Sequence, residues 1–260
     1  MTYLLLLPLL YGLIILLSHV FQDKMLFLPT RLSAQYNFEF EENFEEVLLD
    51  RKGQLLDAVF FPQKDSSRGL ILYFHGNADD LQRWGRYAVD FTHLGFEVMM
   101  IDYPGYGKSE GKPSEKAFYE SAKLAYDWAR EKYTAEDIII YGRSIGSGPA
   151  SFLATQEDAR MLILETPFYS MRDVLDRRFP TIFPFDLKHE FPVNQHLERR
   201  KMEEAYIFQG TEDETVPYAS AIKLRPLLAD ESHFITIEGG KHKNLAEFEE
   251  FHTALEKILR

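Results

Sequence analysis

The sequence predicts an α/β fold: a mostly parallel, twisted sheet of about eight strands with helices on both faces. Two observations support this prediction. Short, almost wholly apolar runs recur from residue 39 onward, and most of them are separated by longer stretches with helical patterning. Buried runs that alternate with helices are typical of βαβ units, in which helices cover both faces of a parallel sheet.

The first two strands are expected to form an antiparallel hairpin, because residues 44–50 and 55–62 flank the turn signal RKG at 51–53. The other expected strands lie at 69–74, 96–101, 138–142, 161–165, 205–209 and 233–238. The expected helices lie at 81–94, 115–132, 145–155, 220–228 and 245–259. In such a sheet the ligand site is expected at the carboxyl ends of the strands.

Composition narrows the possible functions. The chain has 260 residues, 45% of them hydrophobic, which is enough for a large core. Its net charge of −12 argues against a nucleic-acid partner, since phosphate contacts need a positive surface. The chain has no cysteine, so disulfides, thiolate metal sites and a cysteine nucleophile are excluded.

The first 22 residues predict an N-terminal transmembrane helix. They carry no charged side chain, and Tyr3 to Val20 would span ~27 Å as a helix. A cleavable signal peptide would need a basic start and a small-residue cleavage site, and neither is present. A buried core helix is disfavoured because leucines lie on every face. Lys24 and Arg31 follow the span and favour a cytoplasmic catalytic domain on a single-pass membrane protein.

The motif GRSIG at 142–146 marks a candidate nucleophile, Ser144. It follows an apolar strand and precedes a helix rich in small residues. A serine on a strained strand-to-helix turn projects its hydroxyl, and the flanking Gly142 and Gly146 avoid clashes at that turn. The placement predicts a nucleophile elbow more strongly than the pentapeptide alone.

A serine nucleophile needs a base, and the base needs an orienting carboxylate. The loop GTEDETVP at 210–217 follows a strand and offers three acids. Asp213 is favoured by the pattern GxxDxxVP, whereas Glu212 and Glu214 are interpreted as solvated side chains. Glu165, at the end of another strand, is an alternative acid that more simply has a structural role.

The base is expected to be His242, in the loop GGKH at 239–242 that follows the last strand. His233 and His252 lie on a strand and a helix and are interpreted as structural. The chain order of serine, aspartate and histidine, each after a strand, is the order of α/β-hydrolases.

Acyl transfer also needs backbone N–H groups aimed at the developing oxyanion. One is expected from Ile145, directly after the nucleophile. The other is expected from Asn77, in the sequence HGNA at 75–78 that follows the third strand. His75 is then a structural residue that orients this turn.

From about residue 45 to the C-terminus the chain resembles the α/β-hydrolase superfamily. The resemblance is carried by YFHGNA (73–78), DYPGYGKSEG (102–111), YGRSIGSG (141–148), GTEDETVP (210–217) and GGKHKN (239–244). With its N-terminal span the chain is similar to small membrane-anchored abhydrolases of the acylaminoacyl-peptidase-like branch.

The resemblance implies the α/β-hydrolase fold and a serine hydrolase mechanism with no metal or cofactor. Carried over, the triad is Ser144, Asp213 and His242, with Asn77 and Ile145 as oxyanion donors. One departure is Lys241, which stands where members of the superfamily often have glycine before the histidine.

The glycine-rich stretch 102–111 could instead suggest a phosphate-binding loop. It lacks the first glycine of a Walker A loop, which would fall at Asp102, and the third glycine of a dinucleotide fingerprint comes one place late, at Gly111. No nucleotide partner is expected. The stretch resembles the superfamily's DYxGxGxS loop, so a structural role beside the active site is predicted.

The expected domain organisation is a transmembrane anchor at 1–22, a linker at 23–44 and an α/β-hydrolase domain at 45–260. Residues 168–202 contain several prolines and aromatic residues between two strands. This segment is interpreted as a short lid-like insertion.

The predicted function is that of a membrane-anchored serine hydrolase cleaving carboxylic esters or thioesters through an acyl-enzyme. Its substrate is expected to be a small-molecule or lipid-like acyl ester. Two alternatives remain open: a serine peptidase of the acylaminoacyl or dipeptidyl-peptidase-like type, and a catalytically inactive membrane-anchored binding protein.

Overall fold

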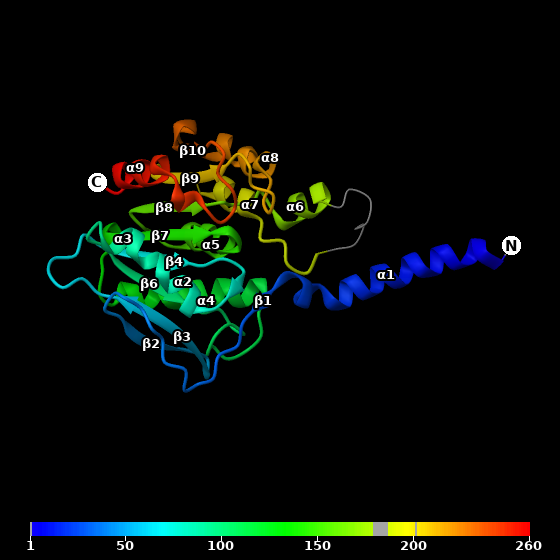
Figure 1. The fold of residues 1–260 in the computed structure, drawn as a ribbon, viewed down its shortest axis with the longest axis horizontal. Helices are drawn as coiled ribbons and strands as arrows, with labels where there is room; N and C mark the ends of the chain where they lie inside the picture. Colours follow the sequence, from blue (N-terminus) through cyan, green and yellow to red (C-terminus); the bar gives the residue numbers. More distant parts are fainter. Residues whose placement is uncertain (1, 179–186, 201) are drawn as a thin grey trace.

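The computed structural model describes residues 2–178, 187–200 and 202–260, except for the side chains of residues 2–9 and 18. Within this part of the chain, eight strands form one sheet in the order β10-β9-β8-β7-β4-β6-β3-β2 (Figure 1). Six neighbouring strands, from β10 to β6, are parallel, and β2 and β3 form an antiparallel hairpin at one edge. The predicted fold class is confirmed.

The strands fall where the apolar runs place them, within one or two residues. In chain order their bounds are β2 Glu45–Arg51, β3 Gln54–Phe61, β4 Leu70–Phe74, β6 Glu97–Ile101, β7 Ile138–Arg143, β8 Met161–Glu165, β9 Ala205–Gly210 and β10 Phe234–Ile237. A further short pair, β1 Leu28–Pro29 and β5 Ala78–Asp79, forms a separate two-stranded parallel sheet.

Helices cover both faces of the sheet, as expected for a parallel sheet. One face carries α4 and α5, and the other carries α2, α3 and α9 (Figure 1). Along β4, for example, Leu70 and Leu72 pack in the core between the sheet and helices α4 and α5. Ile71 and Tyr73 pack in the core on the opposite face, between the sheet and helices α2, α3 and α9. All four side chains are buried, because strands alternate their side chains between two covered faces.

The α-helices are α1 Thr2–Leu26, α2 Leu81–Trp84, α3 Val89–Thr92, α4 Glu115–Arg130, α5 Ser147–Gln156, α6 Met171–Arg178, α7 Val193–Arg199, α8 Tyr218–Ala221 and α9 Glu249–Ile258. The helix predicted at 81–94 is divided by a 3-10 turn at Gly85–Ala88. The helices predicted at 220–228 and 245–259 likewise contain 3-10 turns.

The structure does not support the transmembrane anchor predicted at residues 1–22. Among the described residues, no helix is long and apolar enough to cross a membrane. Helix α1 extends away from the body of the molecule (Figure 1), but it continues through Asp23 and Lys24 to Leu26. Its last turns are bonded to the domain: the Gln22 side chain accepts a hydrogen bond from the Lys188 backbone N–H (2.9 Å). The predicted membrane orientation depended on that span.

The segment that follows α1 packs on the domain that contains the sheet. Phe27 and Phe38 are both buried, one in each core. β1 pairs with β5, which lies a few residues after the end of β4. Residues on both sides of Phe27 therefore contribute to the fold around the carboxyl ends of the strands.

The lid-like insertion predicted at 168–202 is described in part. Residues 179–186 and 201 lie outside the described residues. Of the described part, α6 lies at the carboxyl edge of the sheet, and α7 packs against α5. Phe191, just before α7, is fully buried in the core that contains α4 and α5.

Candidate active site

Ser144 lies at a sharp turn between β7 and α5. Its backbone φ is +53°, in the left-handed region that side-chain-bearing residues rarely adopt. A 3-10 turn at Ser144–Gly146, which leads into α5, maintains this strained backbone conformation. A turn of this kind lifts the serine hydroxyl above the end of the sheet, where a substrate can reach it.

The two glycines of GRSIG are required by close backbone approach. A Cβ on Gly142 would lie 2.5 Å from the Cβ of Ala150 and 2.6 Å from the carbonyl oxygen of Gly146. A Cβ on Gly146 would lie 2.1 Å from the carbonyl oxygen of Phe74. No side chain fits at either position without moving the backbone, which is the geometry predicted for a nucleophile elbow.

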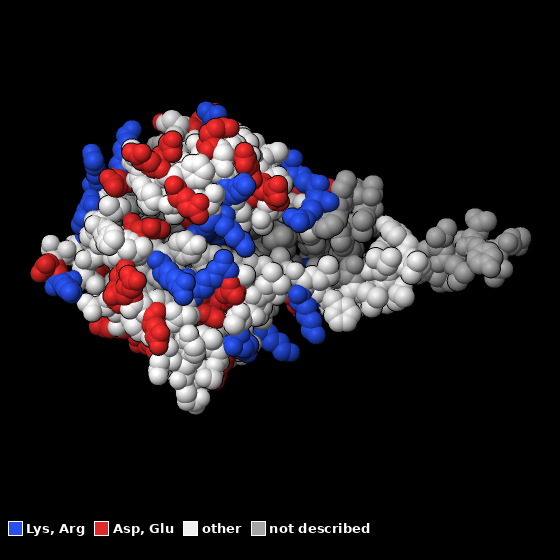
Figure 2. Space-filling model, in the orientation of Figure 1, with Lys and Arg blue, Asp and Glu red and all other residues white. Residues whose placement is uncertain are grey.

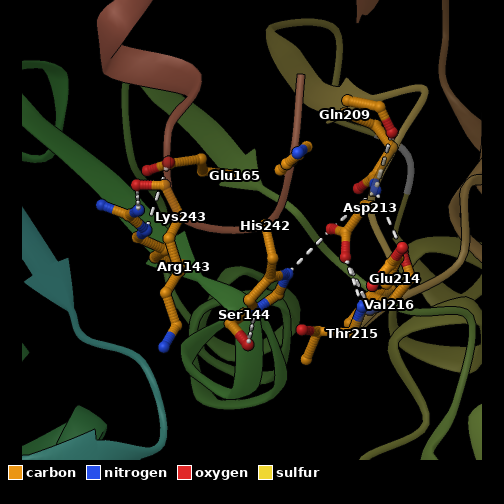
Figure 3. A network of polar contacts seen from close by, with 12 residues as sticks. Arg143, Ser144, Glu165, Gln209, Asp213, Glu214, Thr215, Val216, His242 and Lys243 are labelled. Carbon is orange, nitrogen blue, oxygen red and sulfur yellow. Dashed lines mark hydrogen bonds and ion pairs between the residues drawn. The ribbon is translucent and has the colours of Figure 1, made fainter. Parts of the chain in front are cut away.

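The structure brings the predicted base and acid to the serine (Figure 3). His242 Nε2 lies 2.9 Å from Ser144 Oγ, and His242 Nδ1 lies 2.8 Å from Asp213 Oδ2. The Asp213 carboxylate can only accept, so the ring donates from Nδ1 and its Nε2 is free to accept the serine proton. The three side chains come from different loops that follow β7, β9 and β10.

Asp213 is fixed by donors on both carboxylate oxygens. Oδ1 accepts from the backbone N–H groups of Thr215 (2.9 Å) and Val216 (2.8 Å). Oδ2 accepts from Gln209 Nε2 (3.0 Å) as well as from His242. The side chain is fully buried, and four donors hold it as the charged acceptor that orients the imidazole.

The alternative acid, Glu165, is engaged elsewhere. Its carboxylate forms a buried ion pair with Arg143 Nε (3.2 Å) and accepts a hydrogen bond from Tyr141 Oη (2.7 Å). Arg143 in turn donates to the backbone carbonyl of Lys243 at 3.3 Å. Glu165 therefore holds the histidine loop through Arg143 rather than contacting His242 itself.

The two other acids of the loop, Glu212 and Glu214, are exposed, as the sequence predicted.

The predicted oxyanion residues lie at the same cavity as the serine. Asn77 and Ile145 both line it, together with Ser144 and His242. The side chain of Asn77 is held from two sides: its Nδ2 donates to the Leu26 carbonyl (2.5 Å), and its Oδ1 accepts from Tyr106 Oη (2.9 Å).

His75 is fully buried beneath this turn. Its Nδ1 donates to the carbonyl of Gly76 (2.7 Å), and its Nε2 lies 3.4 Å from Asp102 Oδ1. Burial raises the pKa of Asp102. These contacts agree with the predicted structural role of His75.

The glycine-rich stretch at 102–111 supports the same turn. Tyr103 Oη donates to the carbonyl of His75 (3.0 Å), next to the bond between Tyr106 and Asn77. A Cβ on Gly107, whose φ is +47°, would lie 1.9 Å from Asp102 Oδ2, so the loop can close over the buried carboxylate only with glycine there.

The cavity above Ser144 has a volume of about 530 Å³, a size typical of small-molecule sites. Its apolar walls come from the N-terminal segment, from α6 and the residues just before it, and from the acid loop: Met25, Leu26, Leu28, Phe168, Met171, Val174 and Val216. No group of three or more His, Asp or Glu side chains in the described ranges is placed to hold a metal ion.

This geometry can be set beside known proteins. A family model described as "Serine aminopeptidase, S33" matches residues 65–188. Alpha/beta hydrolase domain-containing protein 17C of Xenopus tropicalis is 28% identical over 211 residues, covering 80% of this chain and 67% of that protein. The protein aho-3 of Caenorhabditis elegans, also an alpha/beta hydrolase domain-containing protein, is 31% identical over 199 residues, covering 75% of this chain and 57% of that protein.

The chain belongs to the α/β-hydrolase superfamily, and it is a serine hydrolase. Solved structures agree on the fold. An esterase of Pyrococcus furiosus superposes with a TM-score of 0.68 at 15% identity, covering 90% of this chain and 96% of that one. The enzyme Est1E of Butyrivibrio proteoclasticus superposes with a TM-score of 0.63 at 18% identity, covering 82% and 96%. These comparisons do not single out the acylaminoacyl-peptidase-like branch.

Sequence reasoning missed four residues that contribute to the site. Arg143 occupies the variable second position of GRSIG, where no residue type is required, so its role was not visible. Gln209 is the last strand residue before the acid loop and clamps Asp213. The N-terminal residues Met25 and Leu28 were assigned to a linker, but they line the cavity. No local sequence pattern shows that the chain returns to the site at these residues.

Proposed function

We propose that the protein cleaves carboxylic esters or thioesters through an acyl-enzyme formed on Ser144. The observation that carries this proposal is the continuous chain of short contacts from Ser144 through His242 to the buried Asp213, which opens onto an apolar cavity. Each residue has the chemical character its position requires: a hydroxyl, an imidazole with its acceptor nitrogen on the serine, and a carboxylate.

Acylation begins when Ser144 Oγ attacks the carbonyl carbon of the substrate and its proton passes to His242 Nε2. The imidazolium is stabilised by the charge of Asp213. The carbonyl oxygen becomes an oxyanion, which the backbone N–H groups of Ile145 and Asn77 stabilise. When the tetrahedral intermediate collapses, the alcohol or thiol leaves with the proton from His242, and the acyl group stays on the serine.

Deacylation repeats these steps with water. His242 Nε2 takes a proton as the water oxygen attacks the acyl carbon, and a second oxyanion forms in the same site. Collapse breaks the bond to Ser144 Oγ, which regains the proton from His242. The carboxylic acid is released, and the resting enzyme is restored without any change of oxidation state.

The cavity favours a substrate with a small or lipid-like acyl group. Its aliphatic and aromatic walls can bury apolar surface at about 25 cal/mol per Å². Among the structural neighbours one is an esterase and another was solved with ferulic acid bound, which supports an ester substrate for this chain.

A peptidase activity is a second candidate, because the matching family model is described as a serine aminopeptidase. An aminopeptidase must bind the free amino group of its substrate, and a carboxylate is the natural partner for that cation. Among the described residues that line the cavity there is no Asp or Glu. The lining therefore favours ester or thioester cleavage over aminopeptidase cleavage.

The test compares three substrates with one acyl size: 4-nitrophenyl butyrate, a butyryl thioester and an aminoacyl 4-nitroanilide. Wild-type protein is expected to cleave the ester and thioester, and Ser144→Ala should reduce kcat by at least roughly 10³-fold. Ser66→Ala, at an exposed serine in the turn between β3 and β4, is the serine control. Anilide cleavage that exceeds ester cleavage would favour the peptidase instead.

A further inference from the structure

The cavity above Ser144 is positively charged, although the chain as a whole is acidic. Four basic residues line it: Arg83, Arg143, Arg178 and Lys243. No carboxylate joins them in the described lining, while the chain carries a net charge of −12. Figure 2 shows Lys and Arg side chains grouped around α2 on the viewed face, with Asp and Glu spread over the surrounding surface.

Two of these four charges are already neutralised. Arg83 forms an ion pair with Asp79, four residues earlier. Arg143 is buried against Glu165 and has its guanidinium carbon 4.4 Å from the centre of the Tyr87 ring. These two arginines hold the walls of the site, so a charged substrate would have to compete with a partner already present.

The other two charges have no carboxylate partner within 4.0 Å in the described ranges. Arg178, at the end of α6, makes a long contact of 3.5 Å with the backbone carbonyl of Glu214. Lys243 directly follows His242, and its side chain is exposed. In Figure 3 it extends from the histidine loop toward the side on which Ser144 lies, and no dashed line ends on its amine.

The chemistry of the reaction decides which part of a substrate meets Lys243. The leaving atom must come within hydrogen-bond reach of His242 Nε2, because that nitrogen returns the proton. The leaving group therefore lies beside His242, where Lys243 is the next residue. The apolar walls from α6 and the N-terminal segment remain for the acyl group.

We infer that the preferred substrates are acyl esters whose leaving group carries an anion, a carboxylate or a phosphate, and that Lys243 is the residue that pairs with it. The inference rests on the proposed esterase function. An ammonium group suits this task, since it contacts carboxylate or phosphate oxygens as a compact point charge. Arg143 donates a hydrogen bond to the Lys243 carbonyl, and this contact holds the backbone from which the Lys243 side chain extends.

The experiment uses a matched pair of substrates: the butyrate ester of 4-hydroxybenzoate, which is anionic, and that of 4-hydroxybenzamide, which is neutral. The readout is the ratio of kcat/KM for the anionic over the neutral ester. Differences in intrinsic reactivity cancel when this ratio is compared between protein variants. The butyrate ester of 4-hydroxyphenyl phosphate then distinguishes a phosphate from a carboxylate preference.

The ratio is expected to fall about five-fold in Lys243→Gln, the size of one exposed charge contact of about 1 kcal/mol. Lys241→Gln is the control: it removes the same charge from the other side of His242, at a residue that does not line the cavity. It should keep the wild-type ratio. Raising the salt from 0.01 to 1 M should lower the ratio in wild type and leave it nearly constant in Lys243→Gln.

An equal ratio in Lys243→Gln and wild type would overturn the inference, as would equal effects of Lys241→Gln and Lys243→Gln. A fall confined to Arg178→Gln would overturn the assignment to Lys243. If the folded wild-type protein cleaves neither ester, the proposed esterase function itself fails. That result differs from turnover of both esters without a charge effect, which removes only the inference.

Discussion

Replacing Asp213 by asparagine probes how the site controls the state of its histidine. Both carboxylate oxygens face only donors: two backbone N–H groups on Oδ1, and Gln209 Nε2 with the His242 ring on Oδ2. The NH₂ of an asparagine would face a donor in either orientation. The simplest way to restore a hydrogen bond is for His242 to present an unprotonated Nδ1, which places the proton on Nε2.

A proton on His242 Nε2 leaves Ser144 without a base. The expected loss in kcat is roughly 10³- to 10⁴-fold, or about 4 to 5.5 kcal/mol of transition-state stabilisation. A loss of stability of about 1–3 kcal/mol should accompany it, because one donor of the buried site is left unsatisfied.

The assay is the steady-state hydrolysis of 4-nitrophenyl butyrate, with thermal unfolding to confirm that each variant is folded at the assay temperature. Glu214→Gln is the matched control, because it removes the adjacent but exposed carboxylate and should keep activity within about two-fold. The reasoning would be refuted if Asp213→Asn kept activity within ten-fold of wild type while folded Glu165→Gln lost it.

Three other perturbations test the structure around the site. Gly146→Ala places a Cβ 2.1 Å from a backbone oxygen and should cost about 3 kcal/mol or more of folding free energy in denaturant titrations; Gly12→Ala, with open space around it, should cost nothing. Deletion of residues 1–21 should keep ester turnover, whereas deletion of 1–31 removes the Leu26 carbonyl and β1 and should lower kcat roughly 10²-fold; equal activity of the two truncations would contradict this role. Burial lowers the pKa of His196 from 6.5 to about 4, so the unfolded chain binds the extra proton between these values and stability falls as pH drops from 6.5 toward 4. At pH 5 the free energy of unfolding of wild type should be about 2 kcal/mol lower than at pH 7 because of this group. If the difference in unfolding free energy between wild type and His196→Phe does not change with pH, this prediction is wrong.

The sheet could be predicted because its strands are buried on both faces. A strand such as β4 needs apolar side chains at every position, which leaves a continuous run in the sequence. Helix patterning was less informative. The predicted helix at 81–94 contains Gly85, where a Cβ would lie 2.4 Å from the Phe40 ring, and the backbone tightens into a 3-10 turn at this contact.

The candidate triad could be predicted for a different reason. Parallel strands deliver their carboxyl ends to one edge, so residues 98 positions apart, such as Ser144 and His242, meet without any local signal. The role of the N-terminal segment could not be predicted in this way. The carbonyls of Leu26 and Thr30 bond to Asn77 and Gly107, and a backbone contact requires no particular side chain.

The central claim is that Ser144 is the nucleophile, and covalent labelling tests it most directly. Purified protein is treated with a fluorophosphonate, which phosphonylates activated serines, and the adduct is located by peptide mapping. The account predicts one adduct on the peptide that contains Ser144, none in Ser144→Ala, and a much slower reaction in Asp213→Asn. A folded wild-type protein that stays unlabelled, or an adduct on another serine, would contradict it.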